Sequence, residues 1–108
     1  MMKSEGILLN SHFLNRMKVG GESGWFYRDN NSASTGYTWS CIPDNSGVYE
    51  MTEEVVLHAS TPAVGVPGAI IWKFMAVRAG KGTVLFELRA PGSGEVVERI
   101  AVTIEASK

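Results

Sequence analysis

The sequence has few of the residues that enzymes and metal sites need. Cysteine occurs once, at Cys41, and histidine twice, at His12 and His58, among 108 residues. A lone cysteine cannot form an internal disulfide. Neither a His-x-x-x-His nor a Cys-x-x-Cys spacing occurs, so we expect no bound metal and no cofactor.

The chain also lacks an excess of one charge and any long apolar run. Ten Lys and Arg against eleven Asp and Glu leave a formal charge of −1, and the basic residues are scattered singly. This distribution argues against a nucleic-acid partner. The first apolar run, 7–9, is shorter than the roughly 7–15 residues of a signal peptide, and nothing approaches the ~20 residues of a membrane span. We expect no membrane partner; the localisation stays open between the cytoplasm and secretion after removal of a leader.

The one candidate nucleophile lacks the surroundings of a reactive thiol. Reactive cysteines lie at helix N-termini or beside cationic groups, whereas Cys41 alternates with Tyr37 and Trp39 as on a strand. We predict a buried, inert thiol. The glycine-rich segment 65–68 lacks the lysine and the following helix of a phosphate-binding loop. The sequence therefore predicts a protein that is not an enzyme.

What the chain does contain is a series of short strand-forming segments. Twelve glycines and four prolines separate stretches that are rich in β-branched and aromatic residues. Alternation is clearest in 70–78, 83–90 and 95–106, where Glu87 lies on the polar side. The short connections between these three segments predict an antiparallel meander. Further strands are predicted within 7–19, 23–29, 37–42 and, with a bulge, 48–58.

This pattern predicts an all-β fold. About seven to eight short strands in a chain of this length are typical of an immunoglobulin-like antiparallel β-sandwich, and a small barrel such as an OB-fold is the alternative. The chain is long enough to bury one core but not two. We therefore expect a single domain over 1–108.

One segment carries a more specific motif. It consists of Asn31, Ser32, Ala33, Ser34, Thr35, Gly36 and Tyr37, followed by Thr38 and Trp39. Its Ser-Thr-Gly-Tyr-x-Trp part resembles the Asn-Pro-Thr-Thr-Gly-Tyr signature of chagasin-type inhibitors of papain-like cysteine proteases. Ser32 and Ala33 stand where that family has Asn-Pro.

Two further segments follow in the order that the family has. The first is Gly65, Val66, Pro67 and Gly68, which precedes a Trp-x-Phe strand at 72–74. The second is Arg89, Ala90, Pro91 and Gly92. It resembles the family's Arg-Pro-Trp segment, with Ala90 in place of the arginine and Gly92 in place of the tryptophan, unless Arg89 serves in a shifted register. The resemblance covers 19–104.

The resemblance implies a monomeric, reversible and non-covalent inhibitor of a papain-like cysteine protease. Its three motif segments would be loops at one end of an immunoglobulin-like sandwich, and together they would enter the protease cleft. Gly36 would allow a positive φ, and Tyr37 and Trp39 would anchor the first loop in the core. The alternative is an immunoglobulin-like adhesion or carbohydrate-binding module, with Trp25, Tyr27 or Trp72 as a sugar platform.

Overall fold

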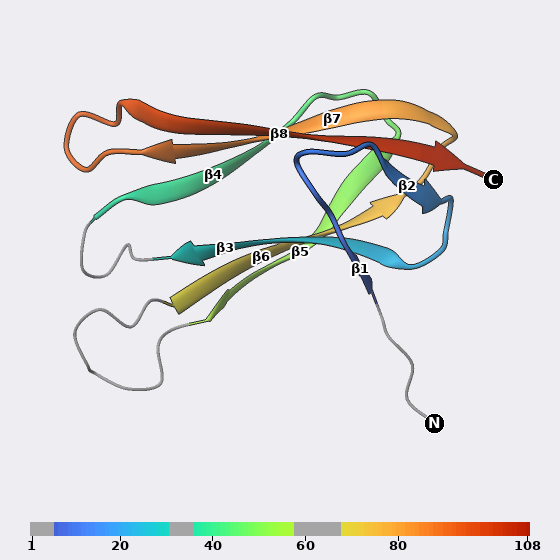
Figure 1. The fold of residues 1–108 in the computed structure, drawn as a ribbon, viewed down its shortest axis with the longest axis horizontal. Helices are drawn as coiled ribbons and strands as arrows, with labels where there is room; N and C mark the ends of the chain where they lie inside the picture. Colours follow the sequence, from blue (N-terminus) through green and yellow to red (C-terminus); the bar gives the residue numbers. More distant parts are fainter. Residues whose placement is uncertain (1–5, 31–35, 58–67) are drawn as a thin grey trace.

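The computed structural model describes residues 6–30, 36–57 and 68–108, which form eight strands in two packed sheets (Figure 1). The strands are β1 (Gly6–Leu8), β2 (Asn15–Lys18), β3 (Ser23–Asn30), β4 (Thr38–Pro43), β5 (Tyr49–Leu57), β6 (Gly68–Ala76), β7 (Gly80–Arg89) and β8 (Val96–Ser107). One sheet has the order β1-β3-β6-β5 and the other β2-β8-β7-β4. The predicted β-sandwich is confirmed. In the described part of the chain no helix is long and apolar enough to cross a membrane.

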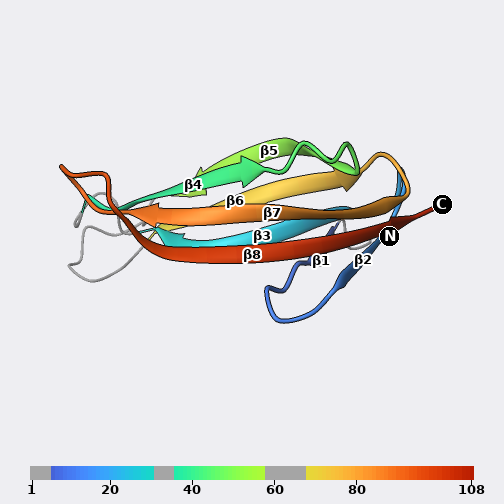
Figure 2. The same ribbon diagram turned by 90° about the horizontal axis from the view of Figure 1, so that it is seen from above.

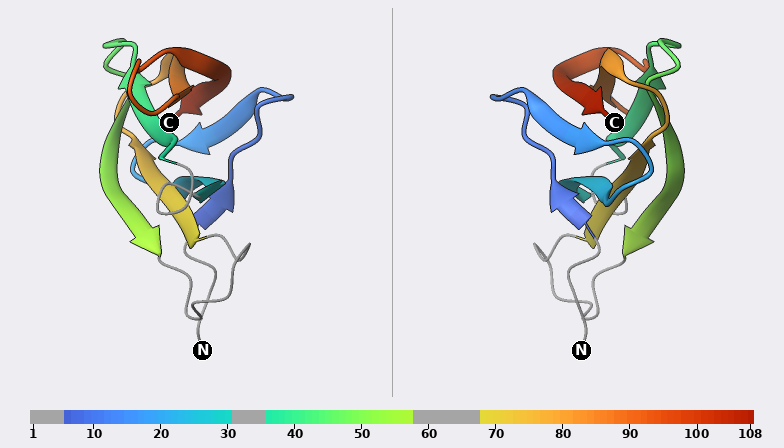
Figure 3. Two further views of the ribbon diagram at one scale, coloured as in Figure 1. Left: turned by 90° about the vertical axis from the view of Figure 1, so that its left-hand side faces the viewer. Right: turned by 90° about the vertical axis from the view of Figure 1, so that its right-hand side faces the viewer.

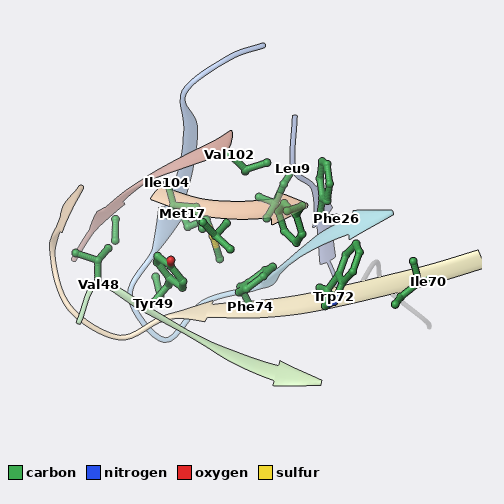
Figure 4. Packing of buried hydrophobic residues seen from close by; sticks show 14 residues of the cluster. Leu9, Met17, Phe26, Val48, Tyr49, Ile70, Trp72, Phe74, Val102 and Ile104 are labelled. Atoms are coloured by element: carbon green, nitrogen blue, oxygen red, sulfur yellow. The ribbon is translucent and has the colours of Figure 1, made fainter. Parts of the chain in front are cut away.

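The core lies between the sheets and is rich in aromatic side chains (Figure 4). The side of β6 that the sequence predicts to be apolar is the buried one, and Trp72 and Phe74 are both fully buried. The ring of Phe86 on β7 packs 4.7 Å from Trp72 and 4.3 Å from Phe26 on β3, centroid to centroid. Alternation along β6 and in the 84–86 part of β7 thus identified correctly which side chains fill the core.

The connection between β6 and β7 crosses from one sheet to the other. β7 and β8 pair antiparallel as predicted, but β6 pairs with β3 and β5. The predicted meander is therefore wrong at β6. Alternation shows which side of a strand is buried, and it does not show whether the next strand lies beside it or across the core. Here β6 and β7 face each other, which is why Trp72 meets Phe86.

The two N-terminal strands make the sheets mixed. β1 pairs with β3 and β2 pairs with β8, both in parallel, where an antiparallel sandwich was predicted. Figure 2 shows both strands on the same flank of the sandwich. The chain changes sheets between them, and the buried side chain of Asn15 holds this crossing. Its amide nitrogen donates to the carbonyl oxygens of Asn10, Phe13 and Thr103 at 2.9, 3.1 and 2.9 Å.

The edge strand β5 has the predicted bulge. Its pairing with β6 slips between Met51 and Glu53. A bulge and exposed acidic side chains, here Glu50 and Glu54, discourage an edge strand from pairing with another chain.

Candidate functional site

The strand ends that border the three motif segments lie together at one end of the sandwich, which faces the viewer in the left panel of Figure 3. Asn30, the last residue of β3, pairs with Gly68, the first of β6. Thr38, the first residue of β4, pairs with Arg89, the last of β7, and Arg89 pairs in turn with Val96 of β8. We call this the loop end, and the opposite one the far end. Three connections therefore leave the sandwich from the loop end.

The described residues include part of the predicted site. Outside them lie Asn31, Ser32, Ala33, Ser34, Thr35, Gly65, Val66 and Pro67. Within them lie Gly36 and Tyr37 of the first segment, Gly68 of the second, and the whole of the third, Arg89 to Gly92. Thr35 and Val66 lie outside the described residues, so their placement at one common end stays a prediction.

The first and third segments are in contact through Gly36. This residue has a φ of +80°, and a Cβ placed on it would lie 2.9 Å from Cβ and 3.3 Å from Cγ of Pro91. Both the backbone angle and the close approach exclude a side chain. The predicted positive φ is confirmed, and the group that approaches Gly36 is the ring of Pro91.

The third segment forms a closed turn. The amide of Ala90 donates to the carbonyl oxygen of Glu95 at 2.8 Å, and that of Gly94 donates to the carbonyl oxygen of Ala90 at 3.1 Å. Gly92 and Gly94 have φ values of +77° and +72°. A tryptophan at position 92 would be strained at this angle.

An ion-pair network missed by the sequence analysis ties this turn to the sheet. Glu87 was expected on the polar side of its strand, yet it is 5% exposed. Nη2 of Arg89 lies 2.7 Å from Oε1 of Glu87, and Nε of Arg99 lies 2.9 Å from Oε2. Nη1 of Arg89 donates to the carbonyl oxygen of Gly94 at 3.0 Å. The two guanidinium groups cover the carboxylate of Glu87 and so account for its burial. The burial could have been predicted only from the strand register, in which Glu87 on β7 pairs with Arg99 on β8.

The two aromatic residues of the first segment have different surroundings. Trp39 packs edge-on against Trp72, with ring centroids 6.5 Å apart, as predicted. Tyr37 was also expected in the core, but it is 38% exposed. It precedes β4 and lines an open hollow of about 460 Å³ at the loop end, together with Leu88 and Glu98. Glu98, which interrupts the apolar side of β8, thus lies at the border between the core and the solvent.

Cys41 is half-buried, and its thiol is not activated. Burial, and secondarily the negative charge of Glu54, raises the pKa of Cys41 to about 12. The thiol is therefore protonated at neutral pH, which agrees with the predicted inertness. Within residues 6–30, 36–57 and 68–108, no three His, Cys, Asp or Glu side chains group so that they could hold a metal ion.

The proposed sugar platform has little aromatic surface available. Trp72 is fully buried. The ammonium group of Lys73 lies 4.4 Å from the ring centre of Trp25, whose indole nitrogen is buried. Tyr27 is 47% exposed, and its hydroxyl donates to Asp29 at 2.5 Å. Trp72 therefore offers no face to a sugar, and Lys73 occupies one face of Trp25.

Comparisons with known proteins agree with this architecture. Residues 20–105 match the family model described as chagasin family peptidase inhibitor I42. No curated protein sequence matches. The crystal structure of the cysteine protease inhibitor EhICP2 from Entamoeba histolytica is similar at a TM-score of 0.73 and 12% identity, covering 94% of this chain and 96% of that one. The solution structure of amebosin is similar at a TM-score of 0.60 and 19% identity, covering 94% of each chain. At these identities, the two structures establish a shared fold.

Proposed function

The chain belongs to the chagasin family of peptidase inhibitors, and from this premise we propose that it inhibits papain-like cysteine proteases by inserting its loop end into their catalytic cleft. Like the family, it is an inhibitor and not an enzyme. EhICP2, which shares its fold, is itself a cysteine protease inhibitor.

The observation that carries the proposal is that the strand ends bordering the three motif segments lie together at one end. Their bases belong to both sheets, since β3 and β6 lie in one sheet and β4, β7 and β8 in the other. Loops that project from both sheets at a common end would form a narrow ridge, and a ridge has the shape to fill the catalytic cleft of a protease.

The described part of the loop end favours binding without cleavage. Gly36 is held in a positive-φ turn against Pro91, which is unlike the extended backbone that proteases cleave. The third segment is closed by its own backbone hydrogen bonds, so its ordering costs little entropy on binding. The thiol of Cys41 is protonated and half-buried, so we expect no disulfide with the protease cysteine and a reversible, non-covalent complex.

A titration of papain with the purified chain tests this proposal. Papain of known active-site concentration is mixed with increasing amounts of the chain, and hydrolysis of a fluorogenic peptide is followed. We expect stoichiometric loss of activity, recovery on dilution, and an intact inhibitor by mass spectrometry. Full activity at a large molar excess would refute the proposed function, and cleavage of the chain at the loop end would refute the proposed mode of binding.

A further inference from the structure

The outer face of β7 and β8 carries the one buried carboxylate of the described chain, and it lies beside the loop end. Glu87 is 5% exposed although its strand face is turned to solvent. Its two oxygens accept from Arg89 and Arg99 at 2.7 and 2.9 Å. Charge-assisted bonds at these lengths are strong and directional, so the carboxylate fixes where both guanidinium groups lie.

A second nitrogen of the Arg89 guanidinium group binds the turn of the third segment. While Nη2 binds Glu87, Nη1 donates to the carbonyl oxygen of Gly94 at 3.0 Å. The amide of Gly94 in turn donates to the carbonyl oxygen of Ala90. The guanidinium group of Arg89 therefore links this closed turn to β7. The planar fork of arginine can serve two acceptors at fixed positions, which a lysine ammonium on its flexible stem cannot reproduce.

The turn that Arg89 closes is also the turn that supports the first segment. Pro91 lies between Ala90 and Gly94 in the chain, and its ring meets Gly36 at a distance that admits no side chain. A shift of the third turn by a few tenths of an ångström would therefore move Pro91 into Gly36 or away from it. The position of Gly36 against the third turn therefore depends on this contact.

We infer that Glu87 is a positioning residue of the inhibitor: through Arg89 it holds the third turn, and through Pro91 the third turn holds Gly36 in the position from which the inhibitor binds. This inference rests on the proposed function, because the property that Glu87 sets is affinity for the protease. Glu87 acts at a distance, from the outer face of β7, and need not touch the protease.

The chain offers a matched pair of variants. Arg99 binds the same carboxylate from β8 but, within the described part of the chain, has no hydrogen bond to 90–94. Arg89→Lys and Arg99→Lys make the same chemical change, and each leaves a cation beside Glu87. Only Arg89→Lys removes the bond to Gly94. Glu53→Gln, which breaks an ion pair of 3.2 Å with Lys73 on the other sheet, serves as the remote control.

The experiment measures dissociation from papain by surface plasmon resonance, together with the ¹H–¹⁵N amide spectrum of each free variant. We expect Arg89→Lys and Glu87→Gln to raise the dissociation rate roughly tenfold, Arg99→Lys to raise it less than threefold, and Glu53→Gln to leave it unchanged. Arg89→Lys should also shift the amide resonances of Gly94 and Gly36, which a uniform loss of stability would not single out. If Glu87→Gln fails to fold, the pair of lysine variants decides the matter alone.

Equal dissociation rates for Arg89→Lys and Arg99→Lys, or unshifted Gly36 and Gly94 resonances in Arg89→Lys, would overturn the inference. These outcomes differ from failure of the proposed function. If the wild-type chain does not bind papain, that function fails, while a selective shift of Gly36 and Gly94 would still support the link from Arg89 to the first segment.

Discussion

The two ends of the sandwich are held together in different ways. At the far end, the carboxylate of Asp44 accepts from the amides of Ser46 and Thr83 at 2.9 and 2.7 Å. The hydroxyl of Tyr49 accepts from the amide of Asp44 at 3.0 Å and donates to the carbonyl oxygen of Thr83 at 2.7 Å. These bonds connect the 44–48 turn to β5 and β7, so they hold the two sheets in place.

At the loop end, the contacts hold one turn against another. Gly36 rests on Pro91, and Arg89 binds the turn that contains Pro91. Substitutions at the far end should therefore lower the free energy of unfolding, whereas substitutions at the loop end should weaken inhibition. The two properties should be separable in one small domain, in line with loops that carry function on a rigid scaffold.

The sharpest separation is expected from two glycines, one at each end. Gly36 and Gly20 have φ values of +80° and +72°, so valine is strained at both. A Cβ at Gly20 meets nothing within 4 Å, whereas one at Gly36 meets Pro91. We expect Gly36→Val to raise the papain inhibition constant roughly 100-fold and Gly20→Val to raise it less than twofold.

The measurement is a set of inhibition constants, taken after circular dichroism has established that both variants are folded. A Gly36→Val chain that inhibits as well as the wild type would mean that the first segment does not contact the protease through this turn.

The converse prediction concerns Tyr49. Burial raises the pKa of Tyr49 to about 12, so its hydroxyl stays neutral and bridges Asp44 and Thr83. Tyr49→Phe leaves both of these groups without that partner, so we expect the free energy of unfolding to fall by about 1–2 kcal/mol. The inhibition constant should not change. Denaturant unfolding provides the first value, and a weaker inhibitor of unchanged stability would contradict the separation.

A smaller effect is expected at Asp44. Partial burial raises the pKa of Asp44, but the hydrogen bonds that its carboxylate accepts from Thr83 and Ser46 lower the pKa by more. The pKa of Asp44 therefore lies below its ordinary value. A group whose pKa is lower in the folded state stabilises the fold above its unfolded pKa of about 4 and loses this contribution as the pH falls through the folded value. Asp44→Asn should therefore be less stable at pH 7 and show a flatter loss of stability below about pH 4. Parallel acid-unfolding curves for the two proteins would contradict this.

The two ends also differ in how far the sequence predicts them. Strand faces follow from alternation, which is why the burial of Trp72 and Phe74 and the core contact of Trp39 were predicted correctly. The positive φ of Gly36 was predicted because glycine tolerates that angle at no steric cost.

Features that depend on which strands are neighbours were not predictable in this way. Glu87 is buried because Arg99 lies opposite it on β8, and Arg89 reaches Gly94 only because the turn folds back over the sheet. Tyr37 alternates correctly with Trp39 yet lies beyond the end of the core, which alternation alone cannot locate. The hydrogen bonds of the far end were not predicted for the same reason, since Asp44 and Thr83 are distant in sequence.

One measurement tests most directly whether the loop end binds the protease. Six glycines with positive φ serve as amide probes, three at the loop end (Gly36, Gly92 and Gly94) and three at the far end (Gly20, Gly47 and Gly80). The ¹⁵N-labelled chain is titrated with papain whose catalytic cysteine has been replaced by alanine. We predict that the loop-end resonances shift or broaden while the far-end resonances stay in place. Shifts confined to the far-end glycines would contradict the account.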